Sequence, residues 1–115
     1  MYTKIVIFIQ NNPLESHRPS EGIRIALGLA ACNHSVDVIL ANQASLLLSD
    51  RIEDRVNGER TAQYLAELKE YVPAFLIDKE TVGEMPYLSN EYKTVPLSRH
   101  EIAQKIAAAT CFVTF

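Results

Sequence analysis

The side chains that most often carry catalysis, metals or sulfur chemistry are few in this sequence and lie far apart. The three histidines, His17, His34 and His100, have no histidine, cysteine or carboxylate partner at the spacing of a zinc motif. The two cysteines, Cys32 and Cys111, stand in apolar stretches at opposite ends of the chain, without a C-x-x-C motif. We therefore expect no metal and no cofactor, and we predict that both cysteines are core residues in a protein from a reducing compartment.

Polar side chains follow three predicted strands at the points where the strands end. They are Asn11 and Asn12 after the first strand, Asn42 and Gln43 after the second, and Asp78 and Glu80 after the third. Because open parallel sheets bind ligands beyond the carboxyl ends of their strands, these six residues form a candidate pocket. For Asn11 and Asn12, which precede Pro13, the competing interpretation is ordinary turn chemistry. The chain has no G-x-G-x-x-G and no G-x-x-x-x-G-K motif, which excludes the usual dinucleotide and P-loop sites.

An alternation of strand and helix patterns must position these residues. The apolar run 4–9 is rich in β-branched residues and predicts a buried parallel strand. A helix is predicted from an N-cap at Ser20 to Ala31, with Ala26, Gly28 and Ala30 small enough to let it lie close to the sheet. Further strands are predicted over 36–41, 72–77, 92–95 and 110–115, a helical turn over 46–48, and helices over 59–71 and 98–109. We expect residues 1–115 to form a single α/β domain, a three-layer α/β/α sandwich with a five-stranded, mostly parallel sheet.

Charge and hydropathy exclude two classes of partner. With 11 Lys and Arg against 14 Asp and Glu, the net charge of −3 gives no basic field for a phosphate backbone, so no nucleic acid is expected. No apolar run reaches the length of a membrane span, so we expect a cytoplasmic protein without a membrane partner. The charged segment 50–55 is predicted to be a solvated connector.

The order of these patterns resembles the DsrE/DsrF-like family over essentially the whole chain. The similarity lies in the opening apolar strand, the polar loop into segment 22–30, the strand 36–40 followed by 44–48, and the closing strand 111–115. It is nearest to the YchN-like and DsrF/TusC-like members. The resemblance implies an α/β/α sandwich with strand order 4-3-2-1-5, assembled as trimers or hexamers.

The resemblance also bears on catalysis. Catalytic members of the family carry persulfide sulfur on a cysteine in the loop after the third strand. In this chain that loop is segment 78–86, and Glu80 occupies the position of the cysteine. A carboxylate cannot form a persulfide, so the resemblance favours a protein that is not an enzyme.

Three functions remain open at this point. The first is a non-catalytic, oligomer-forming protein of sulfur relay or sulfur oxidation, which would assemble with itself or with DsrE/DsrH-like subunits. The second is a homo-oligomer that binds a small ligand through Glu80 and the amide side chains, and the third is a sulfurtransferase that uses Cys32. The candidate interface is an apolar and aromatic group in one loop, unless that loop folds back on its own domain. Its residues are Met85, Pro86, Tyr87, Leu88 and Tyr92.

Overall fold

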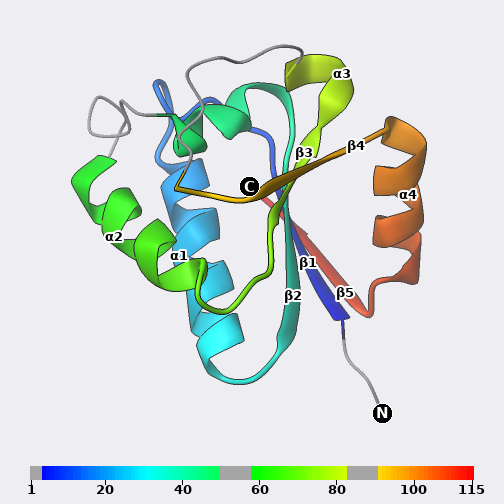
Figure 1. The fold of residues 1–115 in the computed structure, drawn as a ribbon, viewed down its shortest axis with the longest axis horizontal. Coiled ribbons are helices and arrows are strands. Elements are labelled where there is room, and N and C mark those ends of the chain that lie inside the picture. The colour runs from blue at the N-terminus through cyan, green and yellow to red at the C-terminus, as the bar shows by residue number, and fades with distance from the viewer. Residues whose placement is uncertain (1–3, 50–57, 83–90) are drawn as a thin grey trace.

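The computed structural model describes residues 4–49, 58–82 and 91–115, which build one five-stranded sheet with helices on both faces (Figure 1). The strands are β1 (Lys4–Ile9), β2 (Ser35–Leu40), β3 (Phe75–Asp78), β4 (Thr94–Leu97) and β5 (Cys111–Thr114). The helices are α1 (Arg18–Ala31), α2 (Gly58–Leu68), α3 (Lys79–Val82) and α4 (Arg99–Ala108), and η1 (Asn42–Leu48) is a 3₁₀ segment. The predicted three-layer α/β class is confirmed. The charged segment 50–55 lies outside the described residues.

The strands are arranged in the order β4-β3-β2-β1-β5, and every neighbouring pair is parallel. This is the order that the family resemblance implies. Parallel strands need crossover connections, and here α1 and α2 lie on one face of the sheet while α4 lies on the other (Figure 1). All five carboxyl ends therefore lie at the same edge of the sheet.

Side chains that alternate along the strands divide the interior into two cores. Ile5, Ile7 and Ile9 of β1 belong to the larger core, on the side of α1 and α2. Val6 points to the opposite face, where a smaller core forms under α4. The smaller core consists of Val6, Ile39, Leu76, Leu97 and Ile102. The α4 face of the sheet is thus less completely covered than the other face.

The start of α1 differs from the prediction. The helix begins at Arg18, His17 is the cap residue, and its side chain makes no capping hydrogen bond. Pro19 lies in the first turn, where a residue without an N–H costs little. Ser20, predicted as the N-cap, is instead buried inside the helix, and its hydroxyl accepts a hydrogen bond from the hydroxyl of Thr61 in α2 at 2.7 Å. This bond joins the two helices that cover the same face.

The prediction for the small residues of α1 is correct in part, because Ala26 and Ala30 are buried in the larger core whereas Gly28 is not. Gly28 is exposed, and a Cβ added there would have nothing within 4 Å. Gly22 is buried, and a Cβ there would lie 2.9 Å from Cδ1 of Ile9 and 3.1 Å from Cδ2 of Phe115. Gly22, which was not predicted, is therefore a further residue that permits the close approach of α1 to the sheet.

The ends of α1 and α4 use recognised capping motifs. After α1, Asn33 adopts a φ of 68°, and the N–H groups of Asn33 and His34 donate to the carbonyls of Ala30 and Leu29. Asparagine tolerates this left-handed conformation, so the chain can turn directly into β2. At the start of α4, Ser98 and Glu101 form the predicted capping box.

Two strands are displaced from their predicted bounds. The third runs over Phe75–Asp78 rather than 72–77, and the fourth over Thr94–Leu97 rather than 92–95. β4 contains Pro96, which a strand tolerates at the edge of a sheet because no ladder hydrogen bond is needed on the outer side.

The prediction that both cysteines are buried is wrong. Cys32 is the exposed C-cap residue of α1, and Cys111 is exposed at the start of β5. β5 forms the other edge of the sheet, and all four of its residues are exposed, including Phe112 at 43% and Val113 at 37%. Within the described ranges, no helix is long and apolar enough to cross a membrane.

Candidate functional site

A cavity of about 350 Å³ lies at the edge of the sheet where the strands end. β1 ends beside it, β2 continues past it into η1, and the buried end of β3 faces the first turn of α4. The lining residues combine apolar, amide and charged side chains: Phe8, Gln10, Ala41, Asn42, Asp78, Arg99 and Ile102. Its size falls within the range of about 300–1,000 Å³ that is typical of small-molecule sites.

Asp78 is the buried carboxylate of this cavity, with a side chain only 7% exposed. Its Oδ1 accepts a hydrogen bond from the backbone N–H of Glu80 at 3.0 Å, which fixes the turn from β3 into α3. Its Oδ2 lies 3.5 Å from Nε of Arg99. The same guanidinium nitrogen lies 3.3 Å from Oε2 of Glu80, so Arg99 joins both acids across the edge of the sheet.

The structure brings together only part of the candidate pocket. Asn42 and Asp78 line the cavity, and Glu80 is linked to it through Arg99. Asn42 adopts a φ of 54°, a left-handed conformation that turns the chain from β2 into η1.

Asn11, Asn12 and Gln43 are not among the residues that line this cavity. The Asn12 amide donates to Oε1 of Gln43, and its Oδ1 accepts the backbone N–H of Leu14 at 2.9 Å. The contact between Asn12 and the N–H of Leu14 is typical of a turn, which was the competing interpretation for this loop.

Sequence reasoning missed Arg99, the one basic residue among the described residues that line the cavity. The sequence contained a signal for Arg99, because this residue follows the fourth strand. The end of that strand lies at the same edge of the sheet as the end of β3. Leu97 of β4 pairs with Asp78, so the residues just after each strand become neighbours. The rule that located Asp78 would have located Arg99 only with the observed end of the fourth strand at Leu97, because the predicted strand ended at 95.

Of the candidate interface, only Tyr92 belongs to the described residues, and Met85, Pro86, Tyr87 and Leu88 lie outside them. Tyr92 is partly buried and packs edge-on against Phe75, with ring centroids 5.9 Å apart. The ammonium of Lys69 lies 5.8 Å from the centre of the Tyr92 ring. Burial raises the pKa of the Tyr92 hydroxyl, with a smaller contribution from Glu91. The Tyr92 ring thus contacts its own chain.

No group of three or more metal-binding side chains occurs in the part of the chain that the structure describes. The arrangement at the carboxyl ends is suited to binding, since its donors and acceptors surround a cavity with an apolar floor. Arg99 and the amides of Gln10 and Asn42 could hold polar groups of a ligand, while Phe8 and Ile102 offer apolar contact.

Comparison with known proteins relates the chain to one solved fold. The crystal structure of the YchN protein from E. coli matches it with a TM-score of 0.77, over 98% of this chain and 99% of that chain. The two sequences are 21% identical, so the match shows a common fold. No family model and no curated protein sequence matches the chain. The fold that the family resemblance implies is therefore confirmed.

Proposed function

We propose that this protein is a self-associating member of the DsrE/DsrF-like family that contributes a subunit, rather than a sulfur-carrying thiol, to sulfur relay or sulfur oxidation. The fold shared with YchN supports the family assignment. We further propose that it forms a trimer or hexamer, with itself or with DsrE/DsrH-like subunits, through the loop that includes 85–92 and through β5.

The observation that carries this proposal is the exposed edge strand β5. Its four residues are uncharged, and Phe112 and Val113 expose apolar side chains on opposite faces of the strand. Proteins usually protect an edge strand with charges or proline, because its unpaired backbone groups invite another strand.

The opposite edge of the same sheet has that protection and makes the contrast clear. β4 contains Pro96 and directly follows Lys93, whereas Cys111–Thr114 contains neither a charge nor a proline. Arg18 reaches the end of β5, where its guanidinium donates to the carbonyl of Thr114 at 3.4 Å, but the strand itself carries no charge. An apolar edge of this kind is typical of a surface that another subunit covers.

The absence of a sulfur-carrying cysteine in the loop after β3 supports a structural role. Glu80 stands at the position where catalytic relatives carry the cysteine, and its carboxylate contacts Arg99. The two cysteines of the sequence, Cys32 and Cys111, lie near the amino ends of the strands, away from Glu80. We place the protein in the cytoplasm, where exposed thiols such as these remain reduced.

Two measurements test the proposal. Light scattering of the purified chain at micromolar concentration should give a trimer or hexamer, and a monomer both alone and with DsrE/DsrH-like subunits would contradict self-association. Intact-mass analysis after incubation with inorganic polysulfide should show no reducible addition of sulfur. An addition that disappears in Cys32→Ala would instead establish the sulfurtransferase alternative.

The cavity at the carboxyl ends favours a second candidate function, the binding of a small polar ligand. Asp78 and Arg99 together with Asn42 present both donors and acceptors to it. A thermal-shift screen with amino acids and short organic acids should identify a stabilising compound, and that stabilisation should be lost in Glu80→Ala and Arg99→Ala. The matched control is Lys69→Ala, in the turn just after α2 and outside this cavity, which should retain the shift. An unchanged shift in the Glu80 and Arg99 variants would exclude the site.

A further inference from the structure

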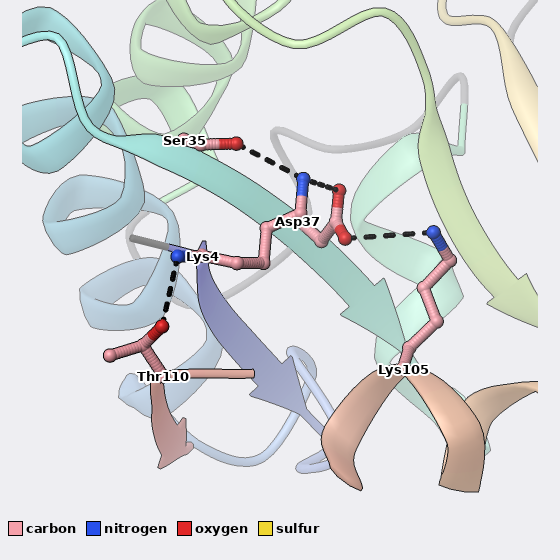
Figure 2. Close-up of polar contacts among 5 residues, drawn as sticks. All are labelled: Lys4, Ser35, Asp37, Lys105 and Thr110. Atoms are coloured by element: carbon pink, nitrogen blue, oxygen red, sulfur yellow. Dashed lines mark hydrogen bonds and ion pairs between the residues drawn. The ribbon is translucent and has the colours of Figure 1, made fainter. Parts of the chain in front are cut away.

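Three charged side chains meet on the α4 face of the sheet, in a cluster that shares no residue with the carboxyl-end cavity (Figure 2). Nζ of Lys4 lies 3.2 Å from Oδ1 of Asp37, and Nζ of Lys105 lies 3.7 Å from Oδ2. The ammonium of Lys4 also donates to the hydroxyl of Ser35 at 3.1 Å. One carboxylate is thus held between two ammonium groups from β1 and α4.

Asp37 occupies a position where the fold alone would favour an apolar residue. It lies within the central strand β2, on the face where the next inward residue, Ile39, is fully buried. Its side chain is only 17% exposed. An apolar residue that packs well is often as stable as a buried ion pair or more stable, so packing alone does not account for the charges.

Lys105 is directed into this cluster rather than along its own helix. Glu101 stands four residues before it, a spacing that commonly gives an ion pair on a helix. The carboxylate of Glu101 instead accepts the backbone N–H of Ser98 at 3.0 Å, and Lys105 contacts Asp37. Among the described residues this is the one polar contact of the Lys105 ammonium, and at 3.7 Å it is longer than a hydrogen bond. Its N–H donors are therefore available to a ligand.

A cavity of about 280 Å³ opens beside the cluster, between α4 and the sheet. It is small for a ligand site, which limits the occupant to a short molecule. Its lining includes the apolar side chains of Leu97 and Ala108 and the amide of Gln104, besides Lys4, Asp37, Glu101 and Lys105. Charged groups therefore lie beside an apolar surface.

We propose that this cleft binds a short-chain organic acid. Its carboxylate lies against the ammonium groups of Lys105 and Lys4, with Gln104 as a further donor, and its apolar chain lies over Leu97 and Ala108. Within the cluster, the two lysines and Asp37 leave one positive charge with which a single carboxylate can pair. Glu101 also lines the cleft and balances the charge of the cleft as a whole, but its carboxylate accepts the backbone N–H of Ser98 at the start of α4, one turn from Lys105. This site is independent of self-association and of the carboxyl-end cavity.

The test is a titration of the full chain with butyrate, followed by the backbone amide signals in ¹H–¹⁵N spectra. Butyrate should shift the signals of Leu97, Gln104, Lys105 and Ala108, whereas its neutral analogue butyramide should leave them in place. Inorganic phosphate should bind more weakly than butyrate, because it cannot use the apolar side of the cleft. Equal shifts with butyrate and butyramide, or tighter binding of phosphate, would overturn the proposal.

Variants separate a ligand site from a purely structural cluster. Lys105→Gln should weaken butyrate binding by about tenfold or more, as expected for loss of a charged donor, and Lys105→Arg should restore it. Asp37→Asn should bind butyrate more tightly, because the ammonium groups lose their internal partner. The control is Lys93→Gln, an exposed lysine outside this cleft, which should bind like the wild type. Unchanged binding in Lys105→Gln, or weaker binding in Asp37→Asn, would show that the cluster is not the site.

Discussion

Nε of Arg99 lies 3.5 Å from the buried carboxylate of Asp78, and this contact joins the end of β3 to the first turn of α4. The two partners differ in their surroundings, because the Arg99 side chain is 66% exposed whereas Asp78 is almost completely covered. Asp78 also accepts the N–H of Glu80, so it holds two segments that follow neighbouring strands. Its position makes it the polar residue on which the geometry of the candidate pocket depends.

Asp78 should therefore contribute more to stability than its partner does. Asp78→Ala removes the acceptor for the partly buried N–H of Glu80, and we expect a loss of about 1–3 kcal/mol in the free energy of unfolding. Arg99→Ala should cost less than about 1 kcal/mol, because an exposed ion pair is screened by solvent. Urea unfolding of both variants measures the difference, and equal losses would mean that the ion pair, not the buried acceptor, dominates.

Two glycines of α1 should respond in opposite directions to the same substitution. Gly22→Ala places a methyl group 2.9 Å from Ile9, so we expect overpacking to destabilise the fold by about 1–3 kcal/mol. Gly28→Ala meets no neighbour and raises helix propensity, so it should stabilise by up to about 1 kcal/mol. Thermal denaturation should show a lower Tm for the first variant and an equal or higher Tm for the second. An unchanged Tm in Gly22→Ala would show that the sheet tolerates a wider separation from α1.

The capping box of α4 makes part of the stability dependent on pH. Hydrogen bonds from Ser98, chiefly from its backbone N–H, hold the pKa of Glu101 below its usual value of 4.5. A carboxyl group with a lowered pKa stabilises the fold fully above its unfolded value, and this contribution is lost as the pH falls through the lower folded value.

The destabilisation caused by Glu101→Ala should therefore be largest near neutral pH and should shrink below about pH 4, where the wild-type carboxylate also becomes protonated. Ser98→Ala should cost about 1 kcal/mol at neutral pH, because it removes the N-cap acceptor. The control is Gln63→Ala, an exposed residue of α2, which should change stability little at any pH. Chemical unfolding between pH 3 and 7 checks this, and a cost of Glu101→Ala that does not vary with pH would refute it.

Local pattern predicted most of the fold because the strands of this sheet are short apolar runs separated by good helix formers. The strand 4–9 and the capping box of Ser98 and Glu101 are confirmed, since each depends on neighbours in sequence. The burial of Cys111 was predicted wrongly for the opposite reason. Its strand has the composition of a central strand, and the prediction of burial followed that composition, although the strand order that the resemblance implies places this strand at an edge.

In the candidate site, too, the residues that depend on local pattern could be predicted and the contacts that depend on strand register could not. Asn42 and Asp78 could be predicted because each follows a strand, and a parallel sheet brings such positions together. The link from Arg99 to Glu80 depends on the register of β3 and β4, which the spacing of residues does not determine. The interface over 85–88 lies outside the described residues and stays a prediction.

The most direct test of self-association is a pair of substitutions at the two edges of the sheet. Val113 of β5 and Val95 of β4 are matched, with exposed fractions of 37% and 36%. We expect sedimentation velocity to show an oligomeric wild type, an equally oligomeric Val95→Lys, and a Val113→Lys variant that is shifted towards monomer with its thermal unfolding retained. A wild type that sediments as a monomer, or a Val113→Lys variant as oligomeric as the wild type, would contradict assembly through β5.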